Sequence, residues 1–276
     1  MPQKNTTGWN PSRRNKKIGT SDQGFKARND FGIPTSRQDD RLYWQKLRDP
    51  VTIPYTIGDH EFAILIEPTD RDHKYYVSVS DLIEVIKCIP EAHRRDIKVF
   101  AFRQPKRKEA IFSHAWGRLG YQVYFGKYSG PTVFLEAQPI DLAYKIKNNI
   151  DADFTQELEK LKQEGHQIEL TKRHFQIRCP PEAIRNTQLY RTLIHEIGHQ
   201  VDYFEKVTRP DEEENADEDL QERYFSRPAK EKEHFAERYA AEMVLQLRSK
   251  NIIPFDPLPI SAEHHSDINP EWFYFA

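Results

Sequence analysis

The chain of 276 residues contains only two cysteines, Cys88 and Cys179, and no run of 18 apolar residues. Two cysteines are too few for a disulfide framework, so they suggest a reducing compartment or thiols packed as small apolar groups. The lack of a long apolar run excludes a conventional membrane-spanning helix, and the first residues lack the apolar core of a signal peptide. A cytoplasmic location is the default expectation, with export by another route or delivery as an effector left open.

The chain also lacks a large excess of either charge, because it contains 41 Lys and Arg and 43 Asp and Glu. The charges are unevenly spread, however. Residues 1–48 carry eleven lysines and arginines against four aspartates, a net charge of +7, which leaves −9 for the rest of a chain whose net charge is −2. Residues 1–40 have few apolar side chains and are predicted to be a disordered basic leader. Such a leader could also contact nucleic acid, although nucleic acid is not the expected partner.

Residues 41–180 are predicted to be rich in strands, because β-branched and aromatic residues recur there in short runs separated by Gly or Pro. A short helix is expected over Asp81–Ile89, with Asp81 and Glu84 spaced as a capping box. Another helix is expected over Phe154–Glu164, ending at Gly165. The predicted strands are Val51–Ile57, Glu61–Ile66, Tyr75–Val79, Lys98–Phe102, Ala110–His114, Tyr121–Phe125, Thr132–Ala137 and His174–Cys179.

Residues 181–250 are predicted to form two long helices, over about Asn186–Phe204 and Ala229–Ser249. The acidic run 211–219 between them is interpreted as a solvated loop. Residues 251–276 form a proline-rich tail whose terminal aromatic residues are expected to dock on the domain. The sequence therefore predicts a single α+β domain over residues 41–276, in which an antiparallel or mixed sheet packs against the C-terminal helices.

The clearest chemical motif is His-Glu-Ile-Gly-His at residues 195–199. Residues four apart share one face of a helix, so His195 and His199 can reach the same metal ion. Glu196 lies about 100° further round and can reach a metal-bound water. Zinc would lower the pKa of that water, and Glu196 would accept its proton as a general base. The same five residues can also arise by chance, so their context matters.

Two features of the context favour a metal site over a pair of surface histidines. The first is an apolar stripe on the arc of the helix opposite the histidines. It consists of Leu189, Leu193, Ile197, Val201 and Phe204. The second is the later helix, where Glu233 and Glu237 share a face with small and apolar residues. Buried carboxylates need positive partners, which zinc, an Arg or Lys from elsewhere, or partial exposure would supply. Spacing alone does not decide between Glu233 and Glu237 as the third ligand.

The metzincin pattern is excluded, because it needs Gly and His at the positions that Asp202 and Glu205 occupy here. Residues 195–203 and the segment Glu-His-Phe-Ala-Glu at 233–237 instead resemble the catalytic core of the anthrax lethal factor group of gluzincins. The resemblance covers about residues 195–250. It implies a zincin-like fold and a zinc metallopeptidase with one Zn²⁺ per chain and a peptide or protein substrate.

Residue roles also follow from this resemblance. It implies that His195, His199 and Glu233 bind the metal and that Glu196 is the general base. Glu237 is then a carboxylate that orients a ligand histidine, and Asp202 is expected beside it in the same supporting role. The family further places a tyrosine shortly before the ligand glutamate, where it stabilises the oxyanion. The nearest candidate is Tyr224, nine residues before Glu233.

Several other expectations concern the surroundings of this motif. An edge strand along the cleft is expected to hold an extended peptide, and Thr132–Ala137 or His174–Ile177 could serve. Trp116 is predicted to belong to the core and not to a substrate platform. The oligomeric state is not predicted. Four other histidines lack metal-like spacing and are predicted not to be ligands, namely His93, His114, His264 and His265.

Two alternative functions stay open at this point. One is a non-catalytic, zinc-stabilised binding or regulatory domain, in which Glu196 would be replaceable without loss. The other is a nucleic-acid-associated protein that uses the basic leader, with binding that weakens as salt is added.

Overall fold

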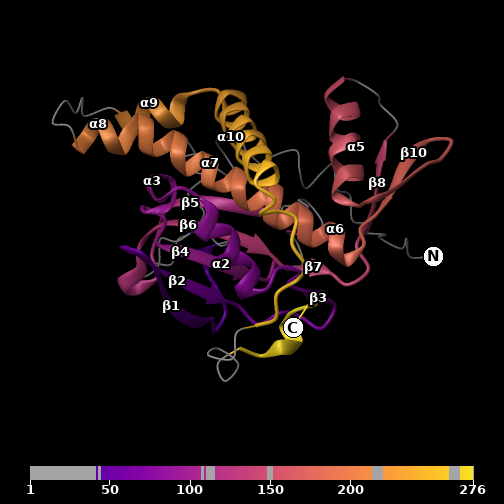
Figure 1. Cartoon of the computed structure of the whole chain (residues 1–276), viewed down its shortest axis with the longest axis horizontal. Helices are drawn as coiled ribbons and strands as arrows, with labels where there is room; N and C mark the ends of the chain where they lie inside the picture. The colour runs from indigo at the N-terminus through magenta and orange to yellow at the C-terminus, as the bar shows by residue number, and fades with distance from the viewer. Residues whose placement is uncertain are drawn as a thin grey trace, which may run out of the picture. The chain divides into compact units, whose positions relative to one another are not determined.

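The structure is a computed structural model that describes residues 42, 45–106, 109, 116–147, 152–212, 220–260 and 268–275 (Figure 1). The chain divides into two units, Met1–Asp40 and Arg41–Ala276. The predicted leader of residues 1–40 lies outside the described residues, as do the predicted strand Ala110–His114 and most of the acidic run. The fold below is that of the second unit.

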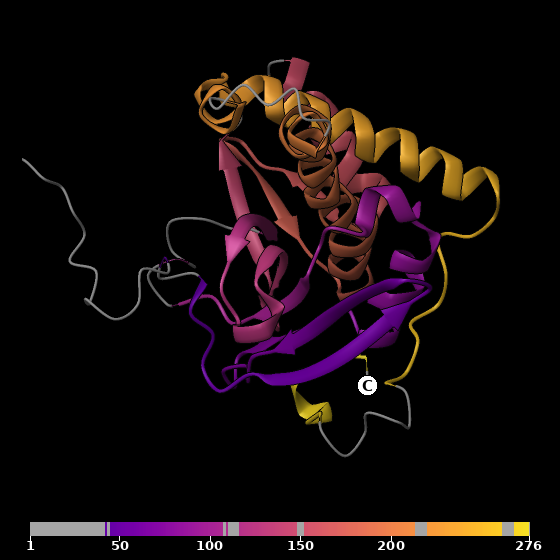
Figure 2. The same cartoon turned by 90° about the vertical axis from the view of Figure 1, so that its left-hand side faces the viewer.

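A five-stranded mixed sheet organises this unit, as Figure 2 shows. Its central strands β2, β4 and β6 run parallel, while β1 and β5 pair antiparallel at the two edges. The strands, in their order across the sheet, are β1 (Val51–Ile57), β2 (His60–Ile66), β4 (Val99–Arg103), β6 (Gly130–Glu136) and β5 (Gly117–Val123). The α+β class and the mixed sheet are therefore as predicted.

The main core lies on the face of this sheet that the helices cover. Alternate residues of a strand point to opposite faces, so Ile64, Phe100 and Leu135 pack toward the helices. Ala63, Val99 and Phe134 point to the other face, where they form a smaller cluster. The larger of the two clusters thus lies under the helices, on the side of the sheet where β5 and β6 come close to α7.

Helix α2 (Val79–Cys88) begins two residues earlier than predicted, because its capping box is Ser78 with Asp81. Ser78 Oγ accepts a hydrogen bond from the Asp81 N–H at 3.0 Å, and Asp81 Oδ2 accepts one from the Ser78 N–H at 3.2 Å. The predicted strand Tyr75–Val79 is therefore wrong, apart from one isolated bridge between Tyr75 and Phe273. The nearest strand, β3 (His73–Lys74), pairs only with β7 (Gln138–Pro139).

A second sheet has three antiparallel strands in the order β8, β10, β9. The strand β10 (His174–Arg178) was predicted, whereas β8 (Ala143–Lys147) and β9 (Gln167–Leu170) were not. Both strands alternate apolar and polar residues, but each is only four or five residues long and has no fully buried residue, so the sequence analysis assigned no strand to them. Helix α5 (Ala152–Glu164) ends before Gly165, as predicted.

Residues 181–212 form one continuous helical rod in five segments, longer than the predicted helix. Two segments are π-helical, and they flank the α-helix that carries the histidines. The segments are α6 (Pro181–Asn186), η3 (Thr187–Thr192), α7 (Leu193–Tyr203), η4 (Phe204–Thr208) and α8 (Arg209–Glu212). The rod therefore includes the first residues of the acidic run, which had been predicted to be a loop. The five residues of the predicted apolar stripe are all buried.

Helix α10 (Ala229–Ser249) has the predicted boundaries, whereas α3 (Glu91–Arg94) and α9 (Leu220–Ser226) were not predicted. The described part of the tail docks on the domain, as expected. Its turn η6 (Pro270–Trp272) precedes Phe273, which is buried against Tyr75 and Phe102. No helix of the described residues is long and apolar enough to cross a membrane.

Candidate metal centre

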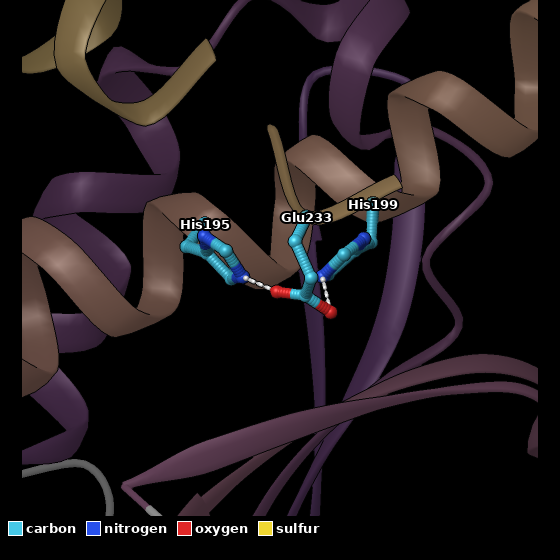
Figure 3. A group of neighbouring side chains, drawn as sticks. All are labelled: His195, His199 and Glu233. Carbon is cyan, nitrogen blue, oxygen red and sulfur yellow. Dashed lines mark ion pairs between the residues drawn. The ribbon is translucent and has the colours of Figure 1, made fainter. Parts of the chain in front are cut away.

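Three predicted ligands come together between α7 and α10 (Figure 3). His195 and His199 project from the same face of α7, and Glu233 reaches both from the first part of α10. His195 Nε2 lies 3.3 Å from Glu233 Oε2, and His199 Nε2 lies 3.6 Å from Glu233 Oε1. One donor atom from each residue lies within 4.8 Å of the other two, and the described residues contain no other such group.

These separations fit one zinc ion. Nitrogen and oxygen ligands lie about 2.0–2.2 Å from zinc, so in a tetrahedral site two ligand atoms are about 3.3–3.5 Å apart. Both contacts of Glu233 are close to this range. Burial lowers the pKa of His195, and burial together with His195 lowers the pKa of His199 to about 4. Neutral imidazoles have the lone pair that coordination requires. Three protein ligands would leave the fourth position to water or substrate.

A close crossing of the two helices brings Glu233 to the histidines. A Cβ atom at Gly198 would lie 2.9 Å from Tyr239 Cδ1 and 3.1 Å from Ala236 Cα. A side chain at position 198 would therefore require the Tyr239 ring to shift and α10 to move away by a few tenths of an ångström, so glycine permits the closest approach of the two helices. Ala236 is fully buried at the crossing. Glu233, one turn before Ala236, then lies over the histidines that flank Gly198.

Glu196 points toward β5, where its carboxylate accepts a hydrogen bond from the Leu119 N–H. Burial raises the pKa of Glu196 to about 8, and the nearby Glu233 carboxylate adds to this rise. A bound cation would oppose both effects. Strand β5 lies close to the rod at Gly117. A Cβ atom at this position would lie 2.7 Å from Thr192 Cγ2 and 2.6 Å from Phe134 O.

The prediction of the edge strand is wrong for both candidates. Thr132–Ala137 falls on β6, which has β4 on one side and β5 on the other. His174–Ile177 falls on β10, which lies between β8 and β9. Among the described strands, the sheet edge beside the histidines is β5. The predicted strand Tyr121–Phe125 overlaps only the last three residues of β5, because the glycines at positions 117 and 120 weaken the alternation of polarity in its first part.

The two predicted supporting carboxylates behave differently. Glu237 is exposed and lies beside His195, but no hydrogen bond joins it to either histidine in the described part of the chain. Glu233 is also exposed, with 57% of its side chain accessible, so the cost of burying carboxylates on this face does not arise. His199 Nδ1 is buried without a hydrogen-bond partner among the described residues.

Asp202 is completely buried and does not contact a ligand histidine through a hydrogen bond. It accepts a hydrogen bond from Arg227 Nη1 at 2.9 Å and one from Lys206 Nζ. Arg227 lies between α9 and α10, so this ion pair attaches the start of α10 to α7. Asp202 therefore supports the site by holding the helix that carries Glu233.

Tyr224 is buried, and its hydroxyl lies 3.1 Å from the hydroxyl of Tyr121 on β5. Tyr121 is only half-buried. Burial raises the pKa of Tyr121 to about 12, the hydrogen bond with Tyr224 opposes this rise, and the negative charges of Asp202, Glu196 and Glu233 add to it. Sequence reasoning missed Tyr121, because its strand assignment did not indicate which face of β5 pointed to the helices.

A cavity of about 630 Å³ opens beside His195 and Glu196, and Trp116 forms part of its lining. Trp116 is half-buried and packs against His166 and the core cluster around β10, so the prediction that it belongs to the core holds only in part. His93 binds the Tyr239 hydroxyl through Nδ1 at 3.0 Å and is not in the metal group. His114, His264 and His265 lie outside the described residues.

No protein-family model, no curated protein and no solved structure matches the chain. The likeness of residues 195–203 and 233–237 to gluzincins thus stays a resemblance of two short motifs, and function has to be argued from the geometry of the site.

The two glutamates of α10 can be distinguished by zinc affinity. Glu233→Ala removes a ligand atom that lies close to both imidazoles, and we expect it to abolish tight zinc binding. Glu237→Ala removes only a nearby negative charge, and we expect zinc affinity to fall by no more than about 10–100-fold. Chelator competition on both purified variants measures the difference. If Glu237→Ala loses zinc and Glu233→Ala retains it, the assignment is reversed.

Proposed function

We propose that the protein is a zinc-dependent endopeptidase with a zincin-like arrangement of sheet and helices. The observation that carries this proposal is the position of Glu196. Its carboxylate lies on the same helix as the two candidate metal-binding histidines, near Glu233, and faces β5, which is an edge strand among the described residues. A site that only stored or structurally bound zinc would not need an additional carboxylate at this position.

The chemistry divides between the ion and the protein. Zinc, when bound, acts as a Lewis acid toward the substrate carbonyl and lowers the pKa of a water molecule. Glu196 accepts the proton of the attacking water and passes it to the amine that leaves. The Leu119 N–H holds the Glu196 carboxylate, and the burial that raises its pKa also favours its protonated form once it has taken the proton.

The free edge of β5 supports a peptide as the substrate. Trp116 O accepts the Glu136 N–H of β6, so the backbone groups of Gly117 and Leu119 point away from β6 in the alternating pattern of an antiparallel pair. The Leu119 N–H is held by Glu196, so an extended peptide can add to this edge through the N–H and C=O groups of Gly117 and the C=O of Leu119. Its scissile carbonyl would then lie near Leu119, at the level of Glu196.

Glu196→Gln tests the proposed role of this residue. We expect the variant to keep its fold and its zinc while peptide hydrolysis falls by roughly 10²–10⁴-fold, because an amide cannot accept the proton. Zinc content by elemental analysis and turnover on a randomised peptide mixture measure both properties. A variant that is as active as the wild type would favour the non-catalytic, zinc-stabilised domain. Loss of zinc together with activity would make Glu196 a ligand.

The two hydroxyls beside the site can be separated by paired substitutions. Tyr121 is half-buried and lies near Glu196, whereas Tyr224 is buried and contacts the Tyr121 hydroxyl. We therefore expect Tyr121 to donate a hydrogen bond to the developing oxyanion and Tyr224 to position Tyr121. Tyr121→Phe should lower kcat by about 10²–10³-fold with little change in KM. Tyr224→Phe should lower kcat by a smaller factor.

The earlier prediction that Tyr224 itself donates to the oxyanion is tested by the same pair. A larger loss of kcat in Tyr224→Phe than in Tyr121→Phe would support it and contradict the order given above. Unchanged kcat in both variants would remove both tyrosines from the mechanism. Tyr124→Phe is a suitable control, because Tyr124 is 63% exposed just beyond β5.

A further inference from the structure

The three-stranded sheet of β8, β10 and β9 has one covered face and one open face. Alternate residues of a strand point to opposite faces, and Phe175 and Ile177 of β10 belong to the same apolar cluster as Leu158 and Leu161 of α5. Helix α5 therefore covers this face. The side chains that point the other way are exposed on both edge strands, β8 and β9. The second face of the sheet is thus open to solvent.

Basic side chains project from this open face. Directly opposed residues of antiparallel strands share a face, and the register places Lys147 of β8 opposite His174 of β10. Lys145 lies opposite Gln176 in the same way, and Arg178 follows two residues further along β10. The five residues of β10 span about 14 Å, and the two edge strands are about 10 Å apart. Three cations therefore lie on one small surface.

The turn between β9 and β10 adds two more cations at one end of this surface. Thr171 donates its N–H to His174 O at 2.9 Å and its Oγ1–H to the same oxygen at 2.6 Å. Thr171 Oγ1 also accepts the His174 N–H at 3.2 Å. Lys172 and Arg173 are the two central residues of this closed turn, and both are exposed. They extend from the outer end of the hairpin that contains β10 (Figure 1).

Neighbouring groups do not neutralise these five cations. Among the described residues, none of the five side chains takes part in an ion pair or a hydrogen bond. Glu169 is the only acidic residue of the three strands and the turn, so this part of the chain has a net charge of +4 from five Lys and Arg and one Glu. Local positive charge of this density attracts polyanions. We call this surface the basic face, and it consists of Lys145, Lys147, Lys172, Arg173 and Arg178.

The composition of the basic face disfavours a protein or a membrane as the partner. Protein interfaces have an apolar centre and are depleted in lysine. Membrane-surface segments insert apolar side chains below the headgroups. The three strands offer neither feature on this side, where Ala143 is the only apolar residue that points outward. Charge is therefore the main property through which this face can recognise a partner.

A nucleic-acid duplex fits these properties better than a single strand does. Single strands are bound by stacking their bases on exposed aromatic rings, and the one aromatic residue of β8, Tyr144, packs on the covered face instead. A duplex needs only cations and polar groups at its phosphates, and it carries one negative charge per about 1.7 Å of its axis. About 14 Å of duplex, the length of β10, thus presents about eight phosphates to both sides.

We propose that the basic face binds the phosphate backbone of double-stranded nucleic acid without reading its sequence. Lys145, Lys147 and Lys172 are assigned as phosphate contacts. The surface belongs to the folded unit and is distinct from the basic leader of residues 1–40. The inference does not rest on the proposed peptidase function, because no residue of the basic face belongs to the candidate metal centre or lines the cavity beside it.

Fluorescence anisotropy of the full chain with a labelled DNA duplex of about 24 base pairs tests this inference. Binding should weaken as salt is added, because the contacts release counterions. A variant with Lys145→Gln, Lys147→Gln and Lys172→Gln should raise Kd by about 10–100-fold at about 0.1 M salt. It should also lower the slope of log Kd against log salt concentration by about 3, or about one for each lost phosphate contact. The three side chains are exposed, so Tm should not change.

A matched control removes three other exposed lysines, through Lys87→Gln, Lys230→Gln and Lys250→Gln. This control lowers the net charge by the same amount, so the long-range attraction to the duplex falls equally in both variants. Because the control leaves the basic face intact, its Kd should differ from that of the wild type by less than about 3-fold.

The leader needs a control of its own, because it also carries positive charge. A second full-chain variant replaces four of its basic residues, through Arg13→Gln, Arg14→Gln, Lys16→Gln and Lys17→Gln. In this background, the three substitutions on the basic face should still raise Kd by at least about 10-fold.

Four results would overturn the inference. Equal losses of affinity in the basic-face variant and its lysine control would indicate general electrostatic attraction. A loss confined to the leader variant would assign the binding to the leader. Tighter binding to either single strand than to the duplex would exclude a duplex-specific surface. Binding of phosphatidylserine vesicles or of a polyglutamate peptide that depends on the same three lysines, without binding of the duplex, would assign the face to another partner.

Discussion

The candidate site depends on one close contact between backbones, at the crossing of α7 and α10. Gly198 lies between the two histidines, and Ala236 faces it from the opposite helix at a distance that leaves no room for a Cβ atom. A larger residue at position 198 would push the helices apart, by a few tenths of an ångström for a single Cβ atom, and so move Glu233 away from the imidazoles. Gly198 in the first motif and Ala236 in the second therefore have the same structural role, because both are small and let the helix axes come closer together.

Several buried polar contacts hold this crossing in place. Asp202 binds Arg227 and so attaches the first turn of α10 to α7. Further along the rod, the buried Asp81 carboxylate binds Arg185 through two hydrogen bonds of 2.8 Å and accepts the Leu258 N–H at 2.9 Å. This carboxylate joins α2, α6 and the tail. Both oxygens of the Asp81 carboxylate have hydrogen-bond partners, so the charges of Asp81 and Arg185 are tolerated in the core. Removing either residue would leave the charge of the other unpaired, at a cost of roughly 3–5 kcal/mol in the free energy of unfolding.

The sequence predicted the parts of this structure that depend on local periodicity. Helix α10 and strand β1 have the expected boundaries, and the apolar stripe of the rod is buried, even though Leu189 and Phe204 at its ends lie in π-helical segments. His195 and His199 lie together as expected because residues four apart share a helix face, whereas the position of Glu233 depends on the crossing of α7 and α10. The free sheet edge could not be predicted, since strand order is set by long-range pairing, and the two glycines of β5 weaken its pattern. Tyr121 was missed because the assignment of its strand did not indicate which face of β5 points to the helices. The capping box was placed one helical turn too late, because Asp81 can occupy either end of such a box.

The central claim is that His195, His199 and Glu233 together bind one zinc ion, and X-ray absorption at the zinc edge on the purified, zinc-loaded chain tests it most directly. The account predicts two imidazole nitrogens and one carboxylate, with the remaining position taken by a light atom, at about 2.0–2.2 Å. The imidazole scattering should disappear in a His195→Ala, His199→Ala double variant. A sulfur shell at about 2.3 Å, which would indicate a cysteine ligand, would contradict the account. An unchanged spectrum in the double variant would contradict it as well.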